Sequence, residues 1–270
     1  MTAPPWEKNW SFLKLERDGR VLTVRFRRED NPVNPMSAAL MQELIDVARA
    51  LEDDHELNAV ILTGTDEVFS AGYDLNDGKA RAELGLAERR VKTRLGPKLC
   101  AAWENIECLT IAAIEGWCIG GGFALAVAAD LRVAGQGARF YVPEIERGMN
   151  MSWGRVPRSV ALIGPATTKR MFILAEKVDA DTALNWGLVD HVVADGNALA
   201  QAELLAKQAA QMPPVGVRMC KEGINAAAFA LAQAVSGMDR DQYLLAQTGE
   251  DFKEGVTSFF EKRPPNFTGD

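Results

Sequence analysis

The sequence predicts an α/β core followed by a helical C-terminal region, and three observations lead to that prediction. Short apolar, β-like runs alternate with helix-like segments from about residue 12 to residue 193. From residue 198 onward the pattern is almost wholly helical. Three consecutive glycines, starting at Gly120, separate a β-like run from a helix-like run in the most apolar stretch. We therefore divide the chain into an α/β core, residues 1–195, and a helical region, residues 196–270.

The individual elements follow from alternation, helical spacing and capping. Two alternating runs flank Arg17-Asp18-Gly19 and indicate a hairpin. Ser37 can cap a helix that extends to about Asp53. A charged stretch, residues 76–94, is expected to be mobile. The other expected strands are residues 59–63, 110–114, 131–134 and 189–193, and the other expected core helices are residues 99–106, 156–163, 167–176 and 180–186 and a helix after Gly122.

Composition narrows the class of protein. With 270 residues, 47% of them hydrophobic and 25% charged, the chain has an ordinary globular composition. The net charge of −7 argues against nucleic-acid binding, and no segment is expected to span a membrane. The four cysteines lie in apolar or helical settings without metal-ligand spacing, so we expect buried free thiols and no metal site. Together with the absence of a signal-peptide pattern, this predicts a cytoplasmic protein.

The glycine run allows three interpretations. A phosphate cradle is disfavoured, because neither G-x-x-x-x-G-K-[ST] nor G-x-G-x-x-G is present in the required register. An oxyanion hole is possible, because backbone N–H groups at such a junction can stabilise a carbonyl oxygen that gains charge. Tight packing of a strand on a helix is equally compatible. Gly72-Tyr73 could supply a second N–H donor or be a simple turn.

Glu144 is the candidate acid–base group. The chain is apolar on both sides of Pro143-Glu144, and burial of a carboxylate raises its pKa toward values useful for proton transfer. The alternative is a loop residue or helix cap. The two histidines, His55 and His191, stand beside acidic residues and are expected at the surface, which argues against a Ser-His-Asp triad.

Several motifs together resemble the crotonase (enoyl-CoA hydratase/isomerase) superfamily over residues 10–267. They are Phe69-Ser-Ala-Gly-Tyr-Asp-Leu75, Gly116-Trp-Cys-Ile-Gly-Gly-Gly122, Ala128-Ala-Asp-Leu131, Pro143-Glu144, Gly187-Leu-Val-Asp-His-Val-Val193 and the tail from Glu250 to Arg263. The resemblance implies a crotonase-like ββα spiral core, a helical C-terminal trimerisation region and a homotrimer or dimer of trimers. It also implies an acyl-CoA thioester substrate, with coenzyme A as part of that substrate and no separate cofactor.

The resemblance also implies roles for individual residues. The N–H groups of Tyr73 and Gly121 would form the oxyanion hole, and Glu144 would carry the proton. Residues matching the substrate-binding positions of the family are Asn31, Val33, Ala71, Asp74, Gly120, Tyr141, Trp153, Phe259 and Lys262. Phe259 and Lys262 match positions that meet the coenzyme A of a neighbouring subunit.

One departure from the family pattern leaves the reaction open. Typical hydratases have two glutamates, and the first position is Ala124 here. Hydration of a bulky or aromatic enoyl-CoA, possibly with retro-aldol carbon–carbon cleavage as in hydroxycinnamoyl-CoA hydratase-lyases, is the first interpretation. An enoyl-CoA isomerase using Glu144 alone is the second, and a non-catalytic acyl-CoA-binding protein is the third. Tyr141, Asn150 and Ser152 are candidates for holding water, and Trp153 is either a pocket wall or a core residue.

Overall fold

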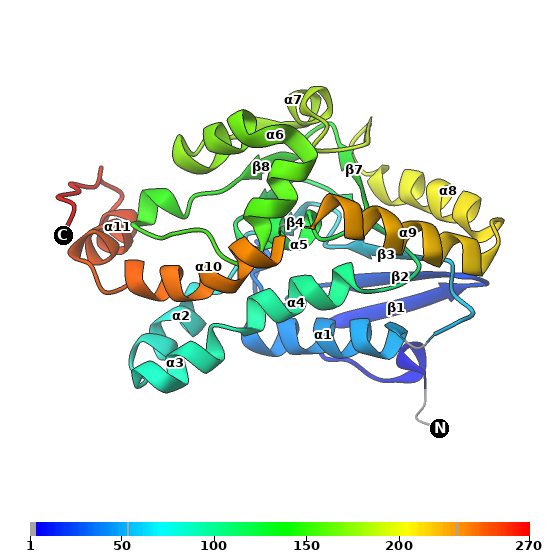
Figure 1. The fold of residues 1–270 in the computed structure, drawn as a ribbon, viewed down its shortest axis with the longest axis horizontal. Coiled ribbons are helices and arrows are strands. Elements are labelled where there is room, and N and C mark those ends of the chain that lie inside the picture. Colours follow the sequence, from blue (N-terminus) through cyan, green and yellow to red (C-terminus); the bar gives the residue numbers. More distant parts are fainter. Residues whose placement is uncertain (1–3, 53, 231) are drawn as a thin grey trace.

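The fold consists of two sheets wrapped by helices (Figure 1). The computed structural model describes residues 4–270 except 53 and 231, so the expected helix end at Asp53 lies outside the described residues. The strands are β1 (Leu13–Asp18), β2 (Val21–Phe26), β3 (Ala59–Thr63), β4 (Val68–Ser70), β5 (Leu109–Ile114), β6 (Trp117–Ile119), β7 (Leu131–Gly135), β8 (Arg139–Tyr141), β9 (Val178–Asp179) and β10 (His191–Val193).

The helices fall into a core set and a C-terminal set. The core set is α1 (Ala38–Glu52), α2 (Leu75–Ala82), α3 (Leu86–Lys92), α4 (Leu95–Glu104), α5 (Gly121–Ala126), α6 (Arg155–Ile173) and α7 (Ala180–Trp186), with short 3-10 helices η1 (Pro5–Glu7) and η2 (Ile145–Arg147). The C-terminal set is α8 (Ala198–Ala210), α9 (Pro214–Ala228), α10 (Ala232–Ala246) and α11 (Glu250–Glu261).

From β3 to β8, successive strands alternate between the two sheets. The larger sheet has the order β1-β2-β3-β5-β7-β10, and all its pairs are parallel except β1–β2. The smaller sheet has the order β4-β6-β8-β9, and only β8–β9 is antiparallel. The pairs β3–β4, β5–β6 and β7–β8 each put one strand in each sheet and are each followed by helices. This repeat confirms the expected ββα core.

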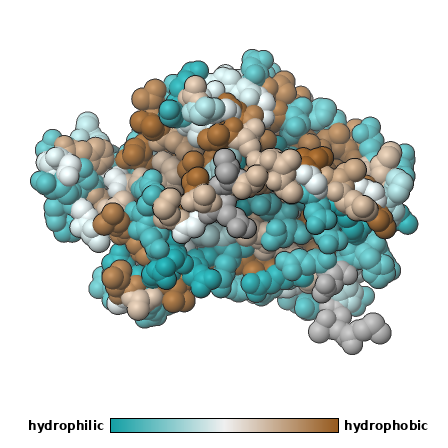
Figure 2. Space-filling model, in the orientation of Figure 1, coloured by the Kyte–Doolittle hydropathy of each residue, from teal (hydrophilic) through white to brown (hydrophobic). Residues whose placement is uncertain are grey.

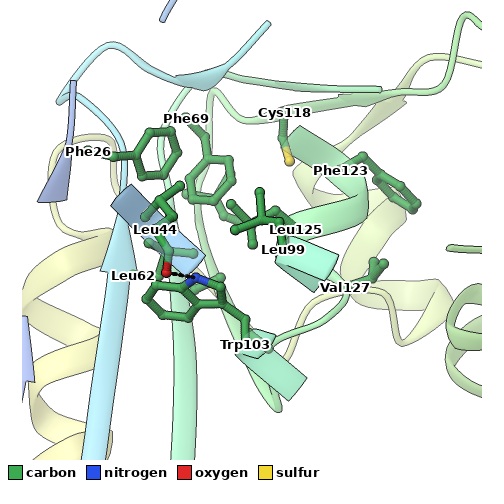
Figure 3. Close-up of a cluster of buried hydrophobic side chains, with 14 of the residues drawn as sticks. Phe26, Leu44, Leu62, Phe69, Leu99, Trp103, Cys118, Phe123, Leu125 and Val127 are labelled. Carbon is green, nitrogen blue, oxygen red and sulfur yellow. Dashed lines mark hydrogen bonds between the residues drawn. The ribbon is translucent and has the colours of Figure 1, made fainter. Parts of the chain in front are cut away.

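The main core lies between the larger sheet, α1, α4 and α5 (Figure 3). It combines aliphatic side chains with aromatic rings, including Phe26 and Phe69 packed edge to face at 5.2 Å between centroids. Trp103 is buried, and its indole N–H donates a hydrogen bond to the carbonyl of Leu44 at 3.2 Å. This satisfied polar group lets a large indole fill the space between α4 and α1. The core thus fixes α5, and with it the glycine run that precedes it.

The opposite face of the larger sheet is covered by α8. Its inward side is a row of alanines, Ala198, Ala202 and Ala206, that pack against β3, β5 and β7. Small side chains at this spacing allow a helix to approach a sheet closely. Helix α8 therefore packs as part of the core. The division between the core and the helical region at residue 195 stays a prediction.

Large apolar side chains remain exposed on the next two helices. On the face shown in Figure 2, hydrophobic residues gather along α9 and α10. They are Val215, Met219 and Ile224 on α9, and Val235, Met238 and Leu245 on α10. Apolar exposure of this extent is typical of an interaction surface. The expected trimer stays a prediction.

Within the described residues, no helix is long and apolar enough to cross a membrane.

Several details of the sequence interpretation need correction. The charged stretch at residues 76–94 is largely helical, in α2 and α3, and Arg90 pairs with Asp241 of α10 at 2.9 Å. By contrast, the two helices expected at residues 156–163 and 167–176 are confirmed: α6 consists of two helical segments separated at Gly164, where φ 73° and ψ 167° are not helical. Cys220 is exposed because it lies on the outward side of α9, whereas the other three cysteines are buried as expected; all four are free.

Candidate active site

The glycine run forms the sharp connection between β6 and α5. Gly120 has φ 53° and ψ −109°, a conformation that side chains with a Cβ rarely adopt. A Cβ at this position would lie 3.0 Å from Oε1 of Glu144, so the missing side chain also makes room for the carboxylate. Gly121 is the first residue of α5, and its N–H is among those for which the helix provides no carbonyl acceptor.

The loop at Tyr73 is held beside this connection. Met36 N donates to the carbonyl of Gly72 at 2.7 Å, and Asp74 N donates to the carbonyl of Met36 at 3.0 Å. In such a parallel bridge the N–H of the residue between the two contacts, Tyr73, points away from Met36. A Cβ at Gly72 would lie 3.0 Å from the nitrogen of Gly121, so the two loops are in direct contact. The two N–H donors expected from the resemblance therefore come from adjacent segments.

Glu144 ends the segment that follows β8. Its side chain is 12% exposed and forms an ion pair with Arg155, whose Nη1 donates to Oε1. The second oxygen, Oε2, is buried and has no hydrogen-bond partner among the described residues. The apolar environment expected from the sequence is thus supplemented by a buried cation. Sequence reasoning missed Arg155, since nothing local marks an arginine eleven residues downstream as a partner.

Trp153 forms one wall of the site. It takes an unusual left-handed conformation, with φ 68°, and its ring meets that of Tyr73 edge to face at 6.4 Å between centroids. A Cβ at Gly121 would lie 2.8 Å from the indole, and a Cβ at Gly96 would lie 1.9 Å from it. The indole therefore fills the space over both glycines and contacts the Tyr73 loop. Trp153 also packs on the core, and its expected contact with substrate stays a prediction.

The position of the first hydratase glutamate is occupied by a small apolar side chain. Ala124 is fully buried in a small apolar cluster with Cys100, Ala128 and Trp153. Burial raises the pKa of the Cys100 thiol to about 11, although the charges of Arg158 and Arg155 act in the opposite direction, so the cysteine is neutral at physiological pH. None of these cluster members carries a carboxylate that could replace the first glutamate.

Two of the three residues expected to hold water, Tyr141 and Asn150, have other hydrogen-bond partners. The hydroxyl of Tyr141 hydrogen-bonds to Glu146, and burial together with this carboxylate raises the pKa of Tyr141. Asn150 donates to the side chain of Gln242 at 2.8 Å. The hydroxyl of Ser152 is buried without a hydrogen-bond partner among the described residues. Of the three, only Ser152 keeps a hydroxyl with no described partner.

Two of the expected substrate-binding residues, Asn31 and Val33, lie alongside the Tyr73 loop. Ala71 N donates to the carbonyl of Val33 at 2.9 Å, and Val33 is half exposed. Asn31 accepts the N–H of Val33 at 3.2 Å. Asp74 is buried and pairs with Arg28 at 3.1 Å. The four residues thus come from two neighbouring segments, one of which carries Tyr73, and their contact with substrate stays a prediction.

Helix α11 lies beside the segment that carries Glu144. Phe259 is half exposed, and the guanidinium of Arg147 stacks on its ring at 4.3 Å. A Cβ at Gly148 would lie 2.4 Å from the carbonyl of Asp251, which shows how closely η2 and α11 approach. Lys262 caps α11 with φ 55°. Phe259 thus lies against Arg147 of η2 in its own chain. The expected contact of Phe259 and Lys262 with a neighbouring subunit stays a prediction.

The sequence also predicts that there is no metal site and that the two histidines lie at the surface. Among the described residues, no group of three or more His, Cys, Asp or Glu side chains has an arrangement that could hold a metal ion. His55 and His191 are exposed, as expected.

Comparison with known proteins assigns the family. A family model described as enoyl-CoA hydratase/isomerase matches residues 16–270. The chain is 32% identical to a short-chain-enoyl-CoA hydratase of Clostridium acetobutylicum, covering 92% of this chain and 94% of the other. It is 31% identical to the 2,3-dehydroadipyl-CoA hydratase of Escherichia coli, covering 96% and 99%. It is 28% identical to the 1,2-epoxyphenylacetyl-CoA isomerase of Escherichia coli, covering 96% and 98%.

Solved structures agree with the sequence relatives. An enoyl-CoA hydratase/isomerase from Pseudoalteromonas atlantica superposes with a TM-score of 0.84 at 26% identity, covering 96% of this chain and all of the other. DspI of Pseudomonas aeruginosa superposes with a TM-score of 0.77 at 31% identity, covering 97% and 98%. The glycine connection, the Tyr73 loop and Glu144 thus stand in a fold shared with these proteins, and the chain belongs to the enoyl-CoA hydratase/isomerase family.

Proposed function

We propose that this protein is an enzyme that binds an enoyl-CoA thioester and forms its enolate. The N–H groups of Gly121 and Tyr73 hold the thioester oxygen, and Glu144 moves the proton. The observation that carries the proposal is the contact of three segments: Gly72 lies against the nitrogen of Gly121, while Gly120 lies against the carboxylate of Glu144. Coenzyme A enters as part of the substrate.

The chemistry follows from this arrangement. A thioester makes the hydrogen on its α-carbon acidic only if the negative charge that develops on the carbonyl oxygen is stabilised. Removing one such hydrogen-bond donor costs about 10²–10³-fold in rate in well-studied enzymes. A positioned proton carrier contributes about 10²–10⁴-fold. The two halves of the site act on the same bond, because donors that stabilise the oxygen also favour release of the proton to Glu144.

Double-bond isomerisation is the reaction that this geometry supports best. Glu144 removes a proton from C2 of a 3-enoyl thioester, the dienolate forms against the two N–H groups, and the same carboxylate delivers the proton to C4. One carboxylate is enough for this sequence. The apolar side chain of Ala124 supports it, since the cluster members packed around it, Cys100, Ala128 and Trp153, carry no second carboxylate.

Hydration is the second candidate, supported by the names of the relatives. The hydratases of Clostridium acetobutylicum and Escherichia coli are 32% and 31% identical to this chain. Addition of water would have to rely on Glu144, with its oxygen Oε2 and the buried hydroxyl of Ser152 as polar atoms lacking described partners. The expected aromatic acyl group and retro-aldol cleavage find no support in these names or in the residues described, and they are outcomes of the test below.

The test offers the purified protein 2-enoyl-, 3-enoyl- and hydroxycinnamoyl-CoA thioesters, with Glu144→Gln as the control. A 2-enoyl product from a 3-enoyl substrate supports isomerisation, and a 3-hydroxyacyl product supports hydration. An aldehyde would restore carbon–carbon cleavage as the activity. Binding of every thioester without turnover would contradict the proposal and indicate a binding protein, and full activity of Glu144→Gln would remove Glu144 as the proton carrier.

A further inference from the structure

Arg155 is a buried cation at the first turn of α6. It is 3% exposed, and its guanidinium donates from Nε to the carbonyl of Ser152 at 2.9 Å and from Nη1 to Oε1 of Glu144. A buried charge is costly unless it is both paired and hydrogen-bonded. Arg155 meets this requirement with two fixed acceptors. The planar fork of an arginine then sets the direction of the carboxylate as well as its charge.

The pairing distinguishes the two oxygens of Glu144. Oε1 is occupied by Arg155, whereas Oε2 is buried without a partner in the described part of the chain. Buried carboxylate oxygens are nearly always hydrogen-bonded, so an exception calls for an explanation. A Cβ on Gly120 would lie 3.0 Å from Oε1 and 3.9 Å from Oε2, so the carboxylate faces the glycine connection. Oε2 is the oxygen left to exchange a proton with a substrate there.

We propose that Arg155 is a positioning residue for the reaction: it holds Oε1 of Glu144 in place and leaves Oε2 to carry the proton. This inference rests on the proposed function, because it assigns Arg155 a role through Glu144. The ion pair with Arg155 explains why Glu144 presents its carboxylate in one orientation. The segment after β8 that contains Glu144 has no regular secondary structure apart from η2.

The other charged groups around Glu144 have different partners. On η2 and β8, Glu146 is engaged by the hydroxyl of Tyr141, and Arg147 stacks on α11. On α10, Asp239 accepts the N–H of Gly154 at 2.8 Å. On α6, Arg158 pairs with Glu104 of α4. Among the described residues, Arg155 is the cation in an ion pair with Glu144.

The test is Arg155→Gln, measured as kcat and KM of the folded protein. We expect kcat to fall about 10–100-fold with little change in KM, because a misplaced catalytic group costs rate rather than binding.

Arg158→Gln is the matched control. It removes a buried guanidinium of the same helix from its own carboxylate, Glu104. It should lower thermal stability while kcat of the folded protein falls less than in Arg155→Gln, because Arg158 reaches the site only through the carbonyl of Trp153, to which it donates at 3.0 Å. If Arg155→Gln left kcat as in the wild type, or if Arg158→Gln lowered kcat by the same factor, the inference would be overturned.

If Arg155→Gln does not fold, a second variant tests the positioning role of Arg155. Arg155→Lys keeps the positive charge but cannot donate to Ser152 and Glu144 with the same fork. We expect kcat to fall about 3–30-fold from lost orientation, with KM near that of the wild type. Unchanged kcat in Arg155→Lys would contradict a positioning role. The proposed function itself would fail in a different way, through an active Glu144→Gln variant.

Discussion

The two halves of the proposed site use different chemical groups. The oxyanion half consists of backbone N–H groups at Gly121 and Tyr73, which strand contacts in the buried core hold in place. The proton-carrying half consists of the side chain of Glu144, which the buried charge of Arg155 on α6 holds in place. Backbone donors are sensitive to anything that adds a Cβ, whereas a side-chain carboxylate is sensitive to the charges around it. The variants below separate these two sensitivities.

Loss of the proton carrier should have the largest effect on rate. Glu144→Gln keeps the shape of the side chain and its ability to accept from Arg155, but it cannot take a proton. We expect kcat to fall about 10²–10⁴-fold with a smaller change in KM. Steady-state kinetics on the best thioester of the panel measures this. A loss of less than threefold would show that another group moves the proton.

Disruption of the oxyanion half should come next. Gly72 has φ 89°, and a Cβ there would lie 2.6 Å from the carbonyl of Ile119. Gly72→Ala must therefore push the Tyr73 loop away from Gly121, and we expect kcat/KM to fall about 10²–10³-fold. Gly85→Ala is the control, because no atom lies within 4 Å of a Cβ at that position. Wild-type kinetics in Gly72→Ala would contradict the placement of the oxyanion hole.

Restoring the missing glutamate should destabilise the fold and fail to improve hydration. Ala124→Glu would bury a carboxylate among Cys100, Ala128 and Trp153. Arg155 and Arg158, whose charges act on Cys100, are already paired with Glu144 and Glu104. We expect the free energy of unfolding to fall by about 3–5 kcal/mol, as for a buried charge without a partner of its own. Denaturant titration measures the loss. A stable variant with faster hydration would show that the space beside Ala124 admits a polar group and water.

The smallest effect concerns Asp239 on α10. Desolvation raises its pKa above the ordinary value of 3.8, so the native state holds the proton more tightly than the unfolded state. This group therefore makes folding less favourable as the pH rises from about 4 through its native pKa. Asp239→Asn keeps an acceptor for the N–H of Gly154 and should lose that pH dependence. Melting temperatures of both proteins between pH 4 and 7 measure the difference, and parallel curves would contradict it.

The two halves also differ in how far the sequence predicts them. Glycines at a strand–helix connection have local backbone demands, so Gly120, Gly121 and the Tyr73 loop stand out in the sequence itself. Glu144 stands out because a lone carboxylate interrupts an apolar run. Arg155 does not stand out in the sequence, because only the turn through η2 and Trp153 in the folded chain brings it to Glu144.

The same distinction holds for the fold. The long strands of the larger sheet follow from apolar runs, and residues 59–63 and 21–26 are strands with the expected limits. The smaller sheet was missed, because strands of two or three residues, such as β9 and β6, are too short to show alternation. The stretch at residues 76–94 was expected to be mobile, but it is largely helical and linked to α10 by the Arg90–Asp241 pair.

The central claim is that Glu144 removes an α-proton while the two N–H groups hold the enolate oxygen. Exchange of the α-hydrogen of an acyl-CoA thioester for deuterium in D₂O, followed by NMR, measures this step without depending on which product forms. We predict exchange by the wild type and a rate at least about 100-fold lower in Glu144→Gln. Equal rates of exchange in the two proteins would contradict the account.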